Sequence, residues 1–186
     1  ISFVMHINNN NLSKKILSWY DNNNRILPWR ISQKFERKQY YRILSEFMLQ
    51  QTQVKTVIPY FKNFVKKIPD LITLSATNYR RVLKLWEGLG YYRRARNLHK
   101  TAKILIKKYN GKLPKKFEEI KKLPGVGEYT ARALLAFVYN QSHIPFDGNI
   151  KRVFSRLFNT NLEKNEKKIK RIINEQFYTN RNGDLA

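Results

Sequence analysis

Apolar residues return every three to four positions along much of this chain, the spacing of one face of an α-helix. The positions are Leu12, Ile16, Leu17 and Tyr20; Leu98, Ala102, Leu105, Ile106 and Tyr109; and Ile169, Ile172, Ile173 and Phe177. Gly111 follows the second group where a helix C-cap is expected. No segment alternates apolar and polar residues with the period of a strand, so the pattern predicts an all-α fold.

Four further segments receive an assignment from the same pattern. Residues 46–64 predict one helix, broken at Pro59 and then briefly continued. Residues 131–139 and 150–158 are apolar enough for buried helices. Residues 31–40 are polar and charged, which predicts a surface loop.

Composition adds a strong electrostatic bias. Lys and Arg number 37 against 13 acidic residues, a formal net charge of +24, which favours a polyanionic partner such as nucleic acid. A lysine-rich composition without any such partner is the alternative. The chain contains no run of about 18 apolar residues, so no membrane span is predicted. The N-terminal residues do not form a secretory signal. The chain has no cysteine, and its three histidines are scattered, so the pattern excludes a disulfide framework and a zinc site and indicates an intracellular protein.

A glycine hairpin at residues 123–127, Leu-Pro-Gly-Val-Gly, precedes one of the predicted helices. Gly125 and Gly127 permit positive φ and a close approach of the backbone to a neighbour, while Leu123 and Val126 can anchor the loop in a core. Free N–H groups at the start of the next helix can bind a phosphate without reading sequence. The alternative is an ordinary turn between two helices.

Two carboxylates stand in settings that suit the cleavage of a glycosidic bond. Such cleavage uses one carboxyl group to protonate the leaving group and a second to face the developing cation. Glu46 lies among apolar residues, where a dry environment would raise the pKa of its carboxyl group; an ordinary surface glutamate is the alternative. Asp147 precedes a predicted helix, where it could act as an N-cap, as the second carboxylate, or as both.

Taken together, the motifs resemble the MutY family of adenine DNA glycosylases, within the helix-hairpin-helix superfamily. The similarity runs from about residue 12 to residue 158. The motifs are Leu27-Pro28-Trp29-Arg30, residues 45–54, residues 86–92, residues 96–100, the glycine hairpin and Asp147-Gly148-Asn149. The resemblance implies an all-α, two-lobed helix-hairpin-helix DNA glycosylase fold, with DNA bound across the cleft between lobes. The domains it implies are terminal-lobe helices at 1–30, a connecting loop and catalytic-acid helix at 31–70, a six-helix barrel lobe at 71–136 with the helix-hairpin-helix at 121–136, and a return to the terminal lobe at 137–186.

The resemblance also implies roles for single residues. Glu46 matches the general acid that protonates N7 of adenine, Asp147 the carboxylate that stabilises the sugar cation, and Tyr129 and Asn149 residues that support that site. Arg30 matches a residue that lines the adenine pocket. Gln51 and Tyr91 match residues that wedge into the duplex, and Leu49 lies near them. The resemblance also implies contacts with the DNA from Gly125, Val126, Gly127 and Lys151. For Tyr91 core packing is the alternative, and for Gln51 a solvent-facing position on a helix. A salt-dependent grip on DNA is expected from Arg93, Arg94, Arg96, Lys121, Lys122, Lys151 and Arg152.

The implied substrate is double-stranded DNA in which adenine is mispaired with 8-oxoguanine or guanine, bound by a monomer, with no membrane partner. In endonuclease III-like relatives a lysine occupies the position of Tyr129 and forms a Schiff base with the sugar. A phenol cannot do this, so a monofunctional glycosylase is expected. Two alternatives stay open: a glycosylase for thymine or an oxidised pyrimidine, and a non-catalytic DNA-binding module.

The chain departs from the family pattern at its end. The family carries a 4Fe-4S cluster on four cysteines, and this chain has none. Residues 181–186 resemble the segment just upstream of the cluster loop. We therefore expect a truncated second lobe, a cluster held by residues beyond Ala186 in a parent protein together with a further C-terminal domain, and, for a bacterial source, a cytoplasmic and nucleoid-associated location.

Overall fold

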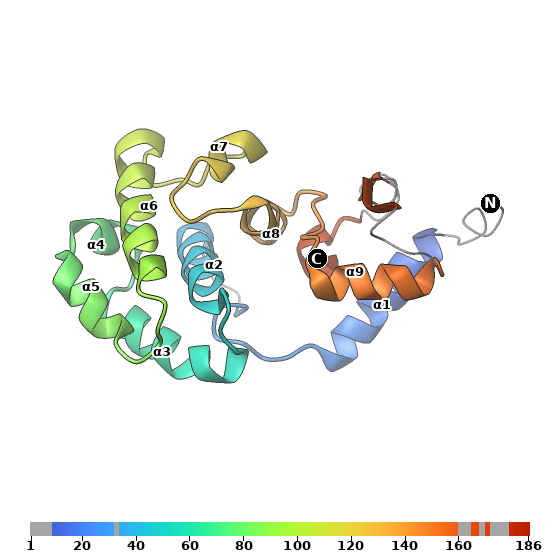
Figure 1. The fold of residues 1–186 in the computed structure, drawn as a ribbon, viewed down its shortest axis with the longest axis horizontal. Coiled ribbons are helices and arrows are strands. Elements are labelled where there is room, and N and C mark those ends of the chain that lie inside the picture. Colours follow the sequence, from blue (N-terminus) through green and yellow to red (C-terminus); the bar gives the residue numbers. More distant parts are fainter. Residues whose placement is uncertain (1–8, 32–33, 160–164, 168–169, 172–178) are drawn as a thin grey trace. The chain divides into compact units, whose positions relative to one another are not determined.

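The computed structural model describes residues 9–31, 34–159, 165–167, 170–171 and 179–186. Within these ranges the regular structure is helical and contains no strand, which confirms the all-α prediction. In chain order the helices are α1 (Asn9–Asn23), α2 (Phe35–Leu49), α3 (Val54–Lys67), α4 (Leu71–Ala76), α5 (Tyr79–Trp86), α6 (Arg93–Tyr109), α7 (Phe117–Lys121), α8 (Glu128–Tyr139), α9 (Gly148–Leu157) and α11 (Asn182–Leu185) (Figure 1). No described helix is long and apolar enough to span a membrane.

The chain folds into two units. Both ends of the chain, residues 1–25 and 128–186, form the first unit, and residues 26–127 form the second. The first unit includes α1, α8, α9 and α11, and the second includes α2 to α7. The four-part division expected from the sequence stays a prediction.

In the core of the second unit, the apolar faces of its amphipathic helices pack together. On α3, Val57, Phe61 and Phe64 lie three to four residues apart and are fully buried. The ring of Phe64 meets that of Trp86 from α5 edge-on, with centroids 6.2 Å apart. The helix α6 ends at Tyr109. Its C-cap, Asn110, is left-handed with a φ of 51°, and the N–H of Gly111 returns to the carbonyl of Leu105. The C-terminus predicted at Gly111 is therefore confirmed to within one residue.

The prediction of one helix over residues 46–64 is wrong. The chain leaves the helix after Leu49, because Gln51 adopts a left-handed backbone with φ 57°, and α3 begins at Val54. Pro59 does not break α3. It removes one backbone hydrogen bond, but the buried face of α3 packs on both sides of it, and tertiary packing outweighs that single loss.

The surface loop predicted for residues 31–40 is also wrong in its second half, since α2 begins at Phe35. The charged residues of this segment occupy the exposed side of the helix, while Gln39 and Tyr40 are buried. The amide of Gln39 bonds to Gly111 and Leu113, and the Tyr40 hydroxyl donates to the carbonyl of Ile68 at 2.7 Å. These partners are distant in the sequence, so the local pattern could not reveal them.

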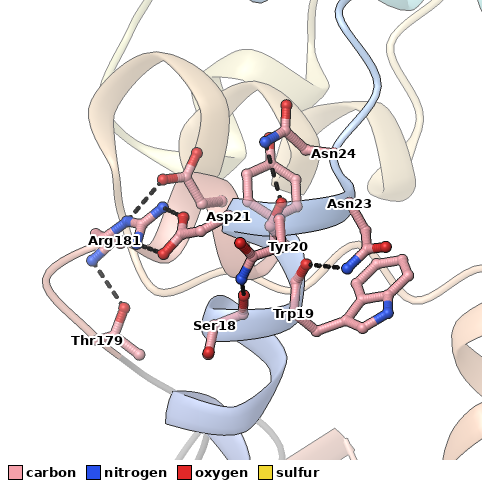
Figure 2. Close-up of polar contacts among 10 residues, drawn as sticks. Ser18, Trp19, Tyr20, Asp21, Asn23, Asn24, Thr179 and Arg181 are labelled. Atoms are coloured by element: carbon pink, nitrogen blue, oxygen red, sulfur yellow. Dashed lines mark hydrogen bonds and ion pairs between the residues drawn. The ribbon is translucent and has the colours of Figure 1, made fainter.

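The first unit brings the two ends of the chain together. Its core contains Ile144, Phe154 and Phe158, with Leu12 of α1 and Leu185 of α11 packed against them. Arg181 forms a two-pronged ion pair with Asp21 of α1, and its two nitrogen–oxygen distances are 2.6 and 3.0 Å. Figure 2 shows this pair. The contact ties the segment before α11 to α1.

The helices of the first unit follow the sequence predictions in part. The periodicity at residues 12–20 corresponds to α1, and α8 buries most of its apolar residues, as expected. The helix α9 is amphipathic instead of buried, since Phe154 is its one buried residue, and Arg152, Val153 and Arg156 are among its residues that are not buried. Ile169, Ile172, Ile173 and Phe177, which predicted a helix, lie outside the described residues.

Candidate active site

Glu46 is a buried acid on the inner face of α2. Only 8% of it is exposed, and its neighbours along the helix, Ile43, Phe47 and Met48, are fully buried. Burial raises the pKa of its carboxyl group to about 7, and the positive charges of Arg42 and Arg30 oppose that rise. The alternative of an ordinary surface glutamate is therefore wrong. A carboxyl group with such a pKa is half protonated near neutral pH and can donate a proton.

The Leu-Pro-Trp-Arg motif places Arg30 within electrostatic reach of this acid. Leu27 and Trp29 are buried, and the Trp29 ring meets Phe61 of α3 edge-on at 5.2 Å. The Arg30 amide closes the turn by donating to the Leu27 carbonyl at 2.9 Å. Arg30 itself is exposed at the end of this anchored turn, and its charge lowers the pKa of Glu46.

Leu49 and Gln51 follow Glu46 at the end of α2. Leu49 is half-buried, and Gln51 is exposed in a tight turn with φ 57°. The alternative for Gln51 was a solvent-facing position on a helix. Gln51 does face solvent, but it lies outside the helix. Gln50, between the two, donates from its amide to the carbonyl of Gly125 at 3.1 Å, so the end of α2 is bonded to the glycine hairpin.

Tyr91 stands exposed at the start of α6, in the loop that follows the Trp-Glu-Gly-Leu-Gly motif. It is 61% exposed and has a left-handed backbone, φ 48°. The alternative of core packing is therefore wrong for Tyr91. An aromatic side chain held out from the surface on a tight turn can insert into a base stack.

The glycine hairpin is held by α6 as well as by Gln50. Gly125 has φ +76°, and a Cβ atom there would lie 2.6 Å from the side chain of Asn97, so this position requires glycine. The Thr101 hydroxyl donates to the carbonyl of Pro124 at 3.1 Å. Leu123 and Val126 are buried, as the sequence predicts for anchors of the loop.

Gly127 differs from Gly125. Its φ is not positive, and a Cβ atom would meet nothing within 4 Å. The conformational freedom expected of both glycines is therefore needed at Gly125 alone. The open space beside Gly127 leaves room for a ligand to approach the backbone just before α8 begins at Glu128.

Asp147 is the N-cap of α9. One carboxylate oxygen accepts from the N–H of Ile150 at 2.8 Å, and the other lies 3.5 Å from the side-chain amide of Asn149. The cap predicted as an alternative role is therefore present, and it uses one oxygen only. Asn149 in turn accepts from Arg152 at 2.8 Å. Asp147 and Asn149 thus lie together, in the first unit, while Glu46 belongs to the second.

The other residues predicted for the first unit are Tyr129 and Lys151. Tyr129 is 43% exposed on the first turn of α8. Lys151 donates to Glu166 at 2.9 Å, and this lysine together with Lys170 lowers the pKa of Glu166 to about 2. A phosphate at Lys151 would therefore compete with an existing ion pair.

The basic residues predicted to hold DNA divide into two groups. Exposed side chains are found at Arg93, Arg96, Lys121, Lys122 and Arg152. The other two are Lys151, which is half-buried and paired with Glu166, and Arg94, which is buried and bonds through its guanidinium to backbone carbonyls, so Arg94 is not available to a phosphate.

Sequence reasoning missed three residues that hold the candidate site together. Arg42 stands four positions before Glu46 on α2, a spacing that places both on one face of a helix and was readable from the sequence. Gln50 and Asn97 contact the hairpin from segments far away in the chain. No local signal marks those two contacts.

The residues present do not fit the cluster that the resemblance implies. A 4Fe-4S cluster is held by cysteine thiolates, and the chain contains no cysteine. In the part of the chain that the structure describes, no group of three or more histidine or acidic side chains could hold a metal ion.

A cavity of about 860 Å³ beside the start of α2 is separate from this site. Phe35, Leu71, Ile72 and Ile106 are among its lining residues, and none of the site residues predicted from the sequence lines it.

Comparison with known proteins identifies relatives of this chain. Residues 44–178 match the HhH-GPD superfamily of base excision DNA repair proteins. A protein named adenine DNA glycosylase from Buchnera aphidicola subsp. Baizongia pistaciae is 49% identical over 159 residues, which cover 85% of this chain and 44% of the relative. The human protein of that name is 42% identical over 147 residues, covering 76% of this chain and 27% of the relative. The chain thus spans less than half the length of these relatives.

Solved structures share the fold. A thermostable thymine-DNA glycosylase superposes with a TM-score of 0.81 at 24% identity, covering 95% of this chain and 83% of that one. Endonuclease III in a non-covalent DNA complex superposes with a TM-score of 0.70 at 20% identity, and the match covers 96% of this chain and 85% of that one. The predicted helix-hairpin-helix glycosylase fold is confirmed.

Proposed function

The chain belongs to the HhH-GPD superfamily of base excision DNA repair proteins, and from this premise we propose that it hydrolyses the N-glycosidic bond of adenine mispaired with 8-oxoguanine or guanine in duplex DNA. The observation that carries the proposal is Glu46, a buried carboxyl group with a pKa of about 7. The relatives named adenine DNA glycosylase support the choice of base.

Glu46 acts as the general acid. A base inside a duplex is out of reach, so the adenine first rotates out of the stack. The protonated carboxyl of Glu46 gives its proton to N7 of the extruded base. The bond between C1′ and N9 then breaks, and its electron pair leaves with the neutral adenine. Arg30 and Arg42, by moderating the pKa rise, keep that carboxyl acidic enough to transfer the proton.

Asp147 stabilises the sugar cation that remains. Its oxygen on the Asn149 side is not used by the helix cap, so a negative charge can face C1′ while the other oxygen still caps α9. Water then adds to C1′ and gives a proton to the carboxylate that Glu46 has become, which leaves a neutral abasic site and restores the acid. Tyr129 offers a phenol where a Schiff base would need an amine, so the chain cleaves no strand by itself.

The DNA is gripped by its backbone and opened by a wedge. The exposed arginines and lysines, together with the net charge of +24, supply sequence-independent attraction to phosphates. Gln51 and Tyr91, exposed on their two turns, fill the space that the adenine leaves. The hairpin and the start of α8 bind one phosphate through backbone N–H groups.

A single-turnover assay on three duplexes tests the proposal, with adenine opposite 8-oxoguanine, adenine opposite guanine, and thymine opposite guanine. We expect breaks only after alkali, and only in the two strands that contain the mispaired adenine. The rate should fall as pH rises above about 7, because Glu46 loses its proton there.

The Glu46→Gln variant is the matched control, because it keeps the shape of the side chain without the acid. It should bind the adenine duplex as tightly as the parent and release no base. Breaks without alkali, or release of thymine, would contradict the proposal. Release of adenine by Glu46→Gln at the parental rate would contradict the proposal that Glu46 is the general acid.

A further inference from the structure

Arg94 is an arginine buried at the start of α6, where a surface cation was expected. It is 6% exposed. Its guanidinium donates to backbone carbonyls in two separate segments. One terminal nitrogen reaches Met48 at 2.6 Å, Gln50 at 2.5 Å and, more weakly, Phe47 at 3.4 Å. The other reaches Leu89 at 3.2 Å and Gly90 at 3.1 Å.

The first set of carbonyls belongs to the end of α2. These oxygens have no partner within the helix, because α2 stops at Leu49 and the chain turns away. A positive charge at a helix C-terminus is favourable, since the aligned peptide dipoles place partial negative charge there. Arg94 therefore closes the helix that carries Glu46, one turn beyond the acid.

The second set of carbonyls belongs to the loop before α6. Leu89 and Gly90 lead directly into Tyr91, whose ring also lies against the guanidinium, 5.3 Å from the centroid to Cζ. The Trp86 ring lies 5.6 Å from Cζ. These rings help to offset the burial of the charge, which lowers the pKa of Arg94.

The two segments share one conformational property. Each passes directly into a left-handed, non-glycine residue, Gln51 with φ 57° after the first set and Tyr91 with φ 48° after the second. Such a backbone is unfavourable and persists where its surroundings hold it. A planar guanidinium with donors on two terminal nitrogens can bind both segments at a fixed separation, and an ammonium group cannot reproduce that geometry.

We propose that Arg94 is a positioning residue that fixes Gln51 and Tyr91 relative to each other, so that both side chains enter the base stack together and the base is extruded. The inference rests on the proposed function, because it assumes that these two residues form the wedge. Arg94 touches neither DNA nor the reacting atoms. Its loss should therefore slow extrusion of the base more than the bond cleavage that follows.

Two substrates separate extrusion from cleavage. In one, the adenine is opposite 8-oxoguanine in a duplex; in the other, it is unpaired in a single strand and needs no extrusion. A fluorescent 2-aminopurine beside the target adenine brightens when its neighbour leaves the stack, and it reports extrusion without chemistry. The variants are Arg94→Met, which removes the donors, and Arg94→Lys, which keeps the charge. Arg81→Met, on the exposed surface of α5, is the control for losing an arginine.

We expect Arg94→Met to lower the single-turnover rate on the duplex at least tenfold and the rate on the single strand less than threefold, with loss of the brightening. Arg94→Lys should lie between this variant and the parent, and Arg81→Met should match the parent. Circular dichroism at the assay temperature shows whether each variant is folded. If Arg94→Met is not folded, the comparison of Arg94→Lys with the parent tests the role of Arg94.

Three outcomes would overturn the inference: equal losses on both substrates, parental behaviour of both Arg94 variants, or no brightening with the parent protein. If the parent brightens the duplex but releases no adenine, the proposed function fails. The brightening of the variants then still decides the role of Arg94.

Discussion

At the scale of single residues, Glu46 has opposite effects on stability and on chemistry. Burial favours the neutral form of its carboxyl group, so the folded protein holds the proton up to a pH of about 7, whereas the unfolded chain releases it near 4.5. Between these values the folded state binds more protons than the unfolded state. Its stability therefore falls as pH rises across this window. The feature that makes Glu46 a useful acid thus destabilises the protein at neutral pH.

This linkage predicts that Glu46→Gln is more stable than the parent above neutral pH. The neutral amide avoids the cost of burying a charge, and the shift of the pKa from 4.5 to about 7 corresponds to about 3 kcal/mol. The gain should be complete above pH 7, should shrink as pH falls toward 4.5, and should disappear below that pH, where the parental carboxyl is neutral in both states. Urea unfolding from pH 4.5 to 8.5 measures it. A difference between the two proteins that does not change with pH would contradict the shifted pKa.

Asp147 illustrates a different compromise at the same scale. One of its oxygens caps α9, and the other lies on the side of Asn149. The cap fixes the direction of the second oxygen, which accepts a long hydrogen bond from the Asn149 amide. The sequence predicts the cap and the carboxylate chemistry as alternatives, but the division of roles between the two oxygens depends on the backbone geometry at the start of α9, which the sequence pattern does not specify.

At the scale of elements, the hairpin combines a conformational demand with a packing demand at one residue. Gly125 has φ +76° and lies against Asn97, whereas Gly127 has neither constraint. We predict that Gly125→Ala lowers the free energy of unfolding by at least about 1–2 kcal/mol, the cost of a left-handed backbone with a Cβ atom. Gly127→Ala should change it by less than about 0.5 kcal/mol, as substitutions away from special sites do.

Chemical denaturation of the parent and the two variants provides the measurement. The two substitutions are chemically identical and two residues apart, so each serves as the control for the other. Equal losses of stability would mean that the hairpin needs both glycines for its backbone, as the sequence alone had predicted. A stable Gly125→Ala protein would contradict the contact with Asn97.

The elements also show how far a sequence pattern reaches. The helical periodicity predicted α1 and α6, because their apolar faces repeat without interruption, and the apolar composition of residues 131–139 predicted most of α8. It failed at residues 50–53, where Gln51 turns left-handed although no glycine or proline marks the break. The prediction of a surface cation at Arg94 was also wrong, because its guanidinium is bonded to two segments, residues 47–50 and 89–90, that are far apart in the chain. Motifs identified the residues of the candidate site, while the contacts that hold them depend on partners distant in the sequence.

At the scale of the whole molecule, the dominant property is charge. A net charge of +24 attracts any polyanion, so DNA binding by itself would say little about a specific interface. Salt dependence is more informative, because each phosphate contact that releases a counterion contributes about 0.9 to the slope of log K against log salt. The slope therefore counts contacts, and charge that lies away from the DNA contributes little to it.

Two lysine pairs make this distinction testable. Lys121 and Lys122 are exposed just before the hairpin, and Lys66 and Lys67 are exposed at the end of α3. Changing either pair to glutamine lowers the net charge by the same two units. We predict that the change at the hairpin reduces the slope by nearly 2, and that the change on α3 leaves it within experimental error, since only the hairpin pair is expected at the phosphates.

Fluorescence anisotropy with a labelled duplex, from 50 to 300 mM salt, measures both slopes. Equal reductions would mean that the hairpin is an ordinary turn and that the protein holds DNA through its overall field. A reduction of nearly 2 confined to the hairpin pair would locate two phosphate contacts beside Gly125. Gly125 would then be needed for the backbone of the hairpin, and the lysines beside it for binding phosphates. The hairpin would therefore act as a DNA clamp and not merely as a connection between two helices.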